Sequence, residues 1–576
     1  MTKTNFILLI LFFSFTQLFS QKIELKLAFN DTILKPIKIV SYNKYINQAE
    51  LKAELKEVIS QLNSQAYLTA TIDSILIDSI QFKVYLHLGK QYKWTYLTTS
   101  NIDEEVLSKI GFRDKIFMNR PFNNRQLYSF YEKIIKHYEN NGFPFASLQI
   151  DSLGIFKNTI SANLNLTKNK FCLVDSVKIV GTATISDQYI QNYIRIKDGD
   201  YYNETLIKNI SNRIKELPFV EENQPFKVIF KEHENELLLH LKKKKASRFN
   251  GVLGIQPDNN TGEIRFTGDV KLNLVNSFKK GEEIDFNWRS IQKNTQDLKA
   301  KFSYPFLFNT PFGFDYNFKL YKKDTTFIDV FNKIGIRYIL KGNNYMSVLF
   351  QNKSSSLLST AGFESLTILP NFADISTQLY GISFYYAKLD YRLNPRKGYE
   401  IDTEGALGTK KIKKNNVLNE SLYDDIKLNS NLYNVSLNAS IYFPIKNRSV
   451  IKVGTQNGLT YNDNLFENEL LRIGGLFTLR GFDEESIYTS AFTVQTIEYR
   501  FILEQNSYLY LFADGAYYEN RKINSNISDT PFGFGAGMSF ETKAGIFSIS
   551  YALGKQFDNP ILFKNAKVHF GFVNYF

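Results

Sequence analysis

The sequence has little of the residue types on which metal and redox chemistry depend. Cysteine occurs once, as Cys172, which excludes a disulfide framework and any cysteine-based metal cluster. The five histidines are scattered, and none stands in the His-x-x-x-His or His-Glu-x-x-His spacing of a metal site. We therefore expect the chain not to be an enzyme, and to have no catalytic residue, no metal site and no cofactor.

Long apolar runs are scarce as well. The mean hydropathy is −0.26, and no stretch after the N-terminus is long and apolar enough for a membrane helix. This excludes a bundle of transmembrane helices but not a membrane β-barrel, whose strands turn only every second residue to the lipid. The run from Phe6 to Phe13 follows Lys3 and is too short to span a bilayer. Residues 1–20 are therefore predicted to be a secretory signal peptide.

Acidic residues are fewer than basic ones, 57 against 70, so the formal net charge is +13. One interpretation of this excess is a nucleic-acid partner. We favour the other, a solvated lysine-rich surface, because the positive charge is spread along the chain and is not clustered. We therefore expect no nucleic-acid partner.

From about residue 22 to residue 245, the sequence combines short strands with amphipathic helices in three similar segments. In the second segment, Asn123 can cap a helix and Gly142 can end it, with an apolar stripe between them. In the third segment, Ser186 and Asn203 can each cap a helix. The stripes are Leu51, Leu55, Val58 and Leu62 in the first segment, and Leu127, Phe130, Ile134 and Tyr138 in the second. The expected α+β domains cover residues 21–92, 93–170 and 171–246.

Beyond residue 246 the helical stripes disappear, and apolar residues alternate with polar ones, as from Val435 to Phe443. A period of two predicts strands with one apolar and one polar face. At about 20 residues for each strand and its connection, residues 247–576 give roughly 16 strands. A soluble β-sandwich would alternate too, but the signal peptide, the length and the 15% of aromatic residues favour a barrel. The predicted fold class is mixed, with tandem α+β domains followed by an all-β, 16-stranded transmembrane antiparallel barrel.

A glycine-rich motif lies within the alternating half. It runs Gly474-Gly475-Leu476-Phe477-Thr478-Leu479-Arg480-Gly481-Phe482. Two acids follow it on predicted strands: Glu498 lies between the apolar Ile497 and Tyr499, and Asp514 follows the apolar Ala513. If these apolar neighbours face lipid, both carboxylates face the lumen. Arginine suits such partners because its planar fork makes bidentate bonds and keeps its charge. The alternative interpretation of the motif is an ordinary exposed turn.

The motif resembles the loop signature of the BamA/TamA family of outer-membrane assembly factors. Four other stretches resemble parts of the same family: two resemble turns of its POTRA domains, one a strand-turn-strand signature, and one the C-terminal signal for membrane insertion. In that order they are Tyr138 to Ala146, Lys197 to Asn203, Asp390 to Tyr399, and Val568 to Phe576. The resemblance covers the whole mature chain. By its size and its three POTRA-like repeats, the chain resembles TamA more closely than BamA.

The resemblance implies that the loop folds back into the lumen and that Arg480 pairs with Glu498 and Asp514. Gly515 directly follows Asp514, whereas family members often place this glycine two residues later, so we rank Glu498 ahead of Asp514. The loop residues implied are Gly474, Gly475, Leu479, Arg480, Gly481 and Phe482. A labile seam between the first and last strands is also implied, which glycines would weaken. The seam residues are Gly251, Gly254, Phe570, Phe572 and Phe576.

For function, the resemblance implies a protein of the Gram-negative outer membrane that assembles, inserts or translocates other proteins. Its POTRA-like domains would lie in the periplasm and bind client outer-membrane or secreted proteins by β-augmentation. Its other partners would be the lipid bilayer and a periplasmic or inner-membrane accessory protein. Two alternatives stay open: a secretion pore of the two-partner type, and a passive porin or structural surface antigen.

Overall fold

The computed structural model describes residues 23–30, 42–78, 81–257, 264–290, 294–361, 363, 366–523, 525–542 and 545–575. The expected signal peptide at residues 1–20 and the expected seam residue Phe576 lie outside them. The chain forms two compact units. The first comprises Met1–Leu173 and Tyr201–Ile207, and the second comprises Val174–Asp200 and Lys208–Phe576. Among the described helices, none is both long and apolar enough to cross a membrane.

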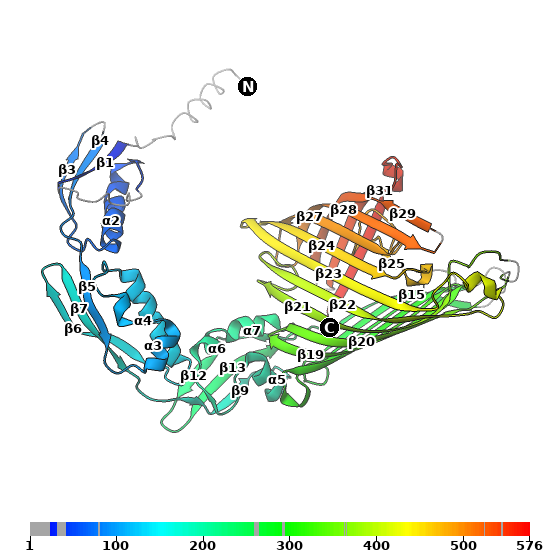
Figure 1. Cartoon of the computed structure of the whole chain (residues 1–576), viewed down its shortest axis with the longest axis horizontal. Coiled ribbons are helices and arrows are strands. Elements are labelled where there is room, and N and C mark those ends of the chain that lie inside the picture. The colour runs from blue at the N-terminus through cyan, green and yellow to red at the C-terminus, as the bar shows by residue number, and fades with distance from the viewer. Residues whose placement is uncertain are drawn as a thin grey trace, which may run out of the picture. The chain divides into compact units, whose positions relative to one another are not determined.

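The first unit begins with a four-stranded sheet packed against one long helix (Figure 1). Its elements are β1 (Ile23–Phe29), β2 (Tyr45–Ile46), α2 (Gln48–Ser64), β3 (Thr71–Ile77) and β4 (Gln81–His87). The strand order is β2-β1-β4-β3, with β1 parallel to β4. Asn47 and Glu50 form a capping box at the start of α2. The predicted stripe is confirmed, because Leu51, Leu55, Val58 and Leu62 are buried against β1 and β4.

The second module repeats this plan with a three-stranded sheet in the order β5-β7-β6. Its elements are β5 (Lys93–Thr99), α3 (Glu104–Ile110), η1 (Asp114–Ile116), α4 (Asn124–Glu139), β6 (Ser147–Phe156) and β7 (Thr159–Thr167). The Asn123 side chain accepts a hydrogen bond from Gln126 N at 3.1 Å, so the predicted cap is confirmed. The four predicted stripe residues of α4 are its buried residues. Gly142 lies three residues beyond α4 with φ +91°, a conformation that favours glycine.

The third module contains three helices and the sheet β11-β13-β12 with its neighbour β9. Its elements are β8 (Leu173–Val174), β9 (Ser176–Val180), α5 (Asp187–Ile194), β10 (Asp200–Tyr201), α6 (Glu204–Lys208), α7 (Ile210–Glu216), β11 (Val220–Glu222), β12 (Lys227–Phe230) and β13 (Asn235–Lys243). Ser186 caps α5 as predicted, by accepting from Tyr189 N. Asn203 accepts from Leu206 N, but its helix breaks at Asn209 into α6 and α7. Asparagine competes for backbone hydrogen bonds, which explains a break at this point.

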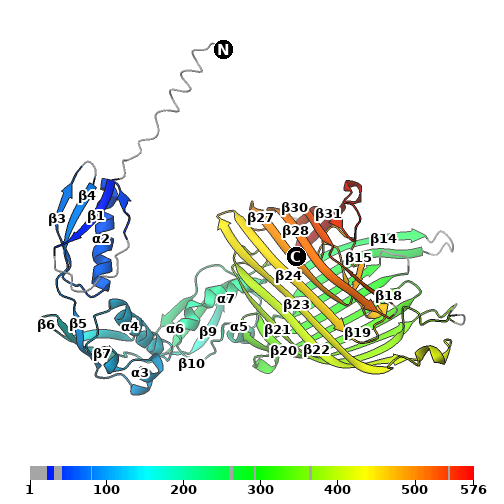
Figure 2. The ribbon, with the colours of Figure 1, turned by 45° about the horizontal axis from the view of Figure 1, so that its top comes forward.

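The rest of the chain closes into an antiparallel barrel (Figure 2). Its strands are β14 (Arg248–Pro257), β15 (Ile264–Val275), β16 (Glu283–Ser290), β17 (Gln296–Tyr304), β18 (Phe312–Lys323), β19 (Phe327–Lys341), β20 (Asn344–Leu357), β21 (Asp374–Leu389), β22 (Gly398–Lys413), β23 (Asn429–Lys446), β24 (Ser449–Tyr461), β27 (Ala491–Ile502), β28 (Tyr508–Lys522), β29 (Ser525–Asp529), β30 (Phe532–Thr542), β31 (Gly545–Lys555) and β32 (Lys567–Tyr575). The short β29 and the following β30 both pair with β28. Counted as one broken strand, they bring the described barrel to sixteen strands, which confirms the predicted fold class.

Alternation along the wall places apolar side chains outside and polar ones inside. Ile497 is 59% exposed and Leu511 is 60% exposed, whereas Glu498 and Asp514 are 4% and 1% exposed. The exposed residues face outward because successive side chains of a strand point to opposite faces. The two carboxylates therefore face the lumen.

Candidate functional site

The glycine-rich motif lies in the long connection between β24 and β27. A short hairpin of β25 (Leu471–Ile473) and β26 (Ile487–Thr489) forms the base of this connection. Apolar residues of the loop are packed against wall residues of β27 and β28 in one buried cluster. The cluster is Ile473, Leu479, Phe482, Ile487, Val494 and Tyr518. The loop is therefore a folded element that packs against the wall, and not an exposed turn.

Three glycines give this loop its bends. Gly474, Gly475 and Gly481 have φ of +110°, +98° and +94°, values that residues with a Cβ rarely adopt. Between them, the Thr478 hydroxyl accepts from Gly474 N at 2.8 Å and donates to Gly474 O at 3.0 Å. Leu479 is fully buried. The backbone thus turns tightly on both sides of Leu479 and Arg480 and aims the arginine at the wall.

Arg480 forms the centre of a buried ion-pair network. Its Nε and Nη2 each donate to Asp514 at 2.7 Å, and its backbone N donates to the same carboxylate at 3.2 Å. Its Nη1 donates to Glu498 at 2.7 Å, and its guanidinium lies 3.6 Å from the centre of the Phe512 ring. Burial disfavours the charged form, but the bonds to Asp514 and Glu498 outweigh it and raise the pKa of Arg480 above its usual value. The loop arginine therefore keeps its charge, and these bonds fix its planar guanidinium group between the two carboxylates.

The network continues beyond the residues that the sequence indicated. Arg500 Nε donates to the second oxygen of Glu498 at 2.7 Å, and Arg500 Nη1 donates to Asn394 at 3.1 Å. Asn394, which is 2% exposed, lies in the connection between β21 and β22. Arg500 could have been found from the sequence, because it shares the inward face of β27 with Glu498 at a spacing of two. Asn394 lies in the Asp390 to Tyr399 stretch, whose resemblance gave no link to the arginine.

Sequence reasoning also missed wall glycines that let the loop approach closely. A Cβ added at Gly533 of β30 would overlap the Arg480 carbonyl oxygen, and one added at Gly554 of β31 would lie 2.7 Å from the Gly481 carbonyl oxygen. A Cβ at Gly481 would in turn lie 2.7 Å from the Leu553 backbone. The alternation of Gly533, Gly535 and Gly537 on one face of β30 was the available signal. These contacts hold the loop backbone directly against β30 and β31.

The seam between the first and last strands is short. Among the described residues, β14 meets β32 through two register pairs, Arg248 with Tyr575 and Phe249 with Asn574, and through one hydrogen bond from Asn250 Nδ2 to the Phe572 carbonyl at 2.5 Å. By comparison, β14 and β15 share ten pairs, and β31 and β32 share seven. The predicted seam residues Gly251 and Gly254 pair with β15, and Phe570 and Phe572 pair with β31. Of these four, Phe572 also bonds across the seam, through its carbonyl to Asn250. Their functional role stays a prediction.

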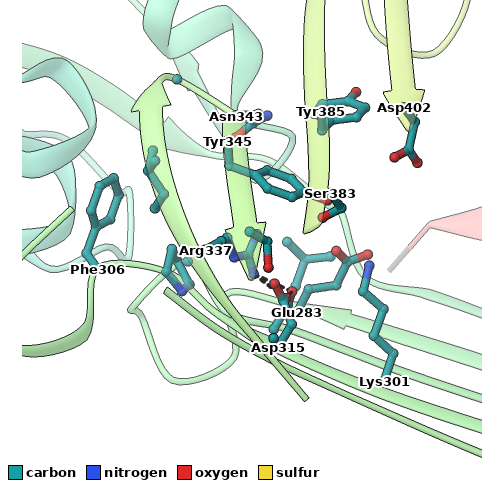
Figure 3. Close-up of a pocket in the computed structure, with 18 of the residues that line it drawn as sticks. Glu283, Lys301, Phe306, Asp315, Arg337, Asn343, Tyr345, Ser383, Tyr385 and Asp402 are labelled. Atoms are coloured by element: carbon teal, nitrogen blue, oxygen red, sulfur yellow. Dashed lines mark hydrogen bonds and ion pairs between the residues drawn. The ribbon is translucent and has the colours of Figure 1, made fainter. Parts of the chain in front are cut away.

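A cavity of about 430 Å³ lies where the third module meets the barrel, within the second unit. Tyr189 and Tyr193 of α5 line it, and the Tyr189 ring stacks edge-on against Phe306 at 5.6 Å. Figure 3 shows charged side chains from several strands facing this space, among them Glu283, Lys301, Asp315, Arg337 and Asp402. Arg337 and Asp315 form an ion pair at 2.6 Å. No group of acidic, histidine or cysteine residues suited to a metal ion occurs in the described part of the chain.

Comparison with known proteins supports the architecture. A model described as the Omp85 superfamily domain matches residues 276–576, and a POTRA model, described as a surface antigen variable number repeat, matches residues 173–223. Among solved structures, CdiB from Escherichia coli has a TM-score of 0.54 at 13% identity, and CdiB from Acinetobacter baumannii has 0.52 at 14%; each alignment covers 92% of this chain and 98% of the other. BamA from Haemophilus ducreyi lacking POTRA domains 1–3 has a TM-score of 0.44 at 14% identity, covering 84% and 100%. No curated protein matches the chain.

Tandem α+β modules before a closed antiparallel barrel define an outer-membrane barrel protein with periplasmic POTRA domains. The family match extends over more than half of the sequence. The chain belongs to the Omp85 superfamily, which confirms the resemblance seen in the sequence at that level. It is located in the outer membrane of a Gram-negative bacterium, with its POTRA domains in the periplasm.

Proposed function

We propose that this protein assembles, inserts or translocates other proteins at the outer membrane, in the manner of the TamA-like members of its superfamily. The observation that carries this proposal is the seam, where the described residues join β14 to β32 by two register pairs and one side-chain hydrogen bond. Few ladder bonds are lost when these strands part, so an incoming strand can pair with the exposed edge. No cofactor and no catalytic step is needed, because client folding supplies the free energy.

We propose that the periplasmic domains end at residues 92, 170 and 246. Each of these modules would offer the edge of its sheet to clients. β3 and β6 each lie at the edge of their sheet. Both carry exposed apolar side chains, including Leu76 at 56%, Leu153 at 60% and Phe156 at 71%. An edge strand with unpaired backbone groups and apolar side chains favours pairing with another extended chain. The expected clients are outer-membrane or secreted proteins in an extended state, and an accessory protein can occupy the remaining module surface.

A photo-crosslinking residue placed at Leu153 should capture client proteins in living cells. The same residue placed at Tyr128 should not, although Tyr128 is 61% exposed, because it lies on helix α4 and not on a sheet edge. Crosslinked partners would be identified by mass spectrometry, with outer-membrane proteins expected among them. Equal capture at the two positions would contradict recognition by β-augmentation.

The alternatives predict a lumen that conducts. Two groups of contacts support a closed lumen instead. One is the Arg480 network, and the other lies at the start of the long connection between β24 and β27. There, the fully buried Lys410 pairs with Glu469 at 2.5 Å, and Lys353 Nζ donates to the Asn468 carbonyl at 2.5 Å. Asn468 also donates to Ser355 and to the Ala373 carbonyl. The start of the loop is thus bonded to β20, to β22 and to the connection before β21.

Single-channel recording of purified protein in planar bilayers should therefore show low and fluctuating conductance. Lys410→Ala should raise the conductance, because it leaves Glu469 buried without its partner and frees the start of the loop. Lys414→Ala is the matched control, since Lys414 forms an exposed pair with Glu420 at 3.7 Å. A large and constant conductance of the unmodified protein would instead support a passive porin.

A further inference from the structure

The last strand of the barrel is covered from the lumen side by the glycine-rich loop. Val568 and Phe570 are 64% and 65% exposed and point outward. Lys567, His569 and Gly571 lie between them and therefore face the lumen. These three consecutive inward positions occupy the first half of β32.

Each of the three positions meets the same short segment of the loop. Lys567 Nζ lies 2.7 Å from an Asp483 carboxylate oxygen. His569 Nε2 accepts a hydrogen bond from Gly481 N at 3.4 Å. A Cβ at Gly571 would lie 3.8 Å from the Leu476 side chain, which is ordinary packing distance.

The same loop segment is fixed to other strands of the C-terminal half. Arg480 binds Asp514 on β28 and Glu498 on β27, and Gly481 packs on the β31 backbone. The loop thus contacts β27, β28, β30, β31 and the first half of β32. On the other side of the seam, the described residues of β14 are held to β32 by two register pairs and by the hydrogen bond from Asn250 to the Phe572 carbonyl.

We propose that the loop holds β32 in place in the barrel wall. When the seam opens, β14 is then the strand that moves, while β32 stays with the loop. Asp483, Lys567 and His569 are then positioning residues that keep the last strand aligned for pairing with β14 or with a client strand. The individual contacts are weak, since Lys567 and Asp483 are 36% and 72% exposed. Their effect comes from attachment to a loop that the buried Arg480 network already immobilises. This inference rests on the seam of the proposed function.

A disulfide reporter across the seam tests the alignment directly. Phe249→Cys and Asn574→Cys form a register pair, and Cys172→Ala removes the native thiol. Adding Lys567→Ala or Asp483→Ala should slow disulfide formation by about threefold to fivefold, the effect expected of a partly exposed ion pair. The exchanged pair Asp483→Lys/Lys567→Asp should recover most of the rate. Lys564→Ala, in the nearby exposed connection, is the control, and an unchanged rate in both single variants would overturn the inference.

A second crosslink identifies the strand that moves. Asp483→Cys and Lys567→Cys would be joined by a short bifunctional maleimide. A direct disulfide is not used, because the long lysine side chain bridges a greater distance between the two backbones than a disulfide can. Client assembly should continue with this crosslink, since β32 stays with the loop. Loss of assembly only in the crosslinked protein would show that β32 must leave and would overturn the inference. The oxidised Phe249→Cys/Asn574→Cys protein should lose assembly; if it remains active, the proposed opening of the seam fails, while the disulfide rates still decide whether the loop aligns β32.

Discussion

Arg480→Ala should strongly reduce both client assembly and the thermal stability of the barrel. The Asp514 side chain is 0% exposed. It would lose the two hydrogen bonds from the guanidinium and keep only those from the backbone N of residue 480 and from the Thr496 hydroxyl. Removing one partner of a buried ion pair costs about 3–5 kcal/mol, against about 0–1 kcal/mol for an exposed pair. Because Arg480 and both of its acids are buried, we expect the cost to be closer to that of a buried pair than to that of an exposed pair. The transition from folded to unfolded mobility on heated gels measures the stability, and a client-insertion assay measures the function.

Arg521→Ala provides a matched control for this prediction. Arg521 forms an ion pair of the same 2.7 Å length with Glu519, but its side chain is 60% exposed. Arg480→Lys should rescue only in part, because an ammonium group cannot bond both carboxylates in the plane of a guanidinium. The double variant Arg480→Ala/Asp514→Ala should lose less than the sum of the single losses, since neither charge is then left unpaired. If Arg480→Ala matches Arg521→Ala in stability and assembly, the network has no functional role.

The two acids should differ in their effects. Asp514→Asn should disturb the loop more than Glu498→Gln does, because Asp514 accepts three of the four hydrogen bonds that Arg480 donates to acids. Protease sensitivity near Arg480 would measure loop displacement in the two variants. Equal or greater sensitivity of Glu498→Gln would contradict the order.

Gly533→Ala should displace the loop without altering any charge. Its added methyl group would overlap the Arg480 carbonyl oxygen, and overpacking of this kind costs about 1–3 kcal/mol. Gly515→Ala is the control, because a Cβ there meets nothing within 4 Å although Gly515 adjoins Asp514. We expect Gly533→Ala to lower assembly and to increase proteolysis at the loop, and Gly515→Ala to leave both unchanged. A normal loop in Gly533→Ala would mean that the close approach to the wall is not needed.

Much of the fold follows from local pattern in the sequence. The stripe from Leu127 to Tyr138 fixes one face of α4, because a helix repeats every 3.6 residues, and Asn123 fixes where α4 begins. Alternation around Glu498 and Asp514 likewise sets the direction of both carboxylates before any neighbour is known. The glycines around Arg480 indicate a tightly bent loop. Each of these features depends on residues that are close together in the chain.

Tertiary structure decided what pairs with what. Asn394 and Arg500 are 106 residues apart and meet because of barrel closure and strand register, which no local pattern encodes. The need for Gly533 arises only once the Arg480 carbonyl lies against β30, a contact between a loop and a strand that follows it by about fifty residues. The seam was expected where first and last strands meet, but its two register pairs among the described residues depend on how the whole barrel closes. The sequence by itself determined the modules, the alternating wall and the charged groups of the loop, because those depend on local periodicity. Only the closed barrel decided which residues these groups contact, because the contacting residues come from strands distant in the chain.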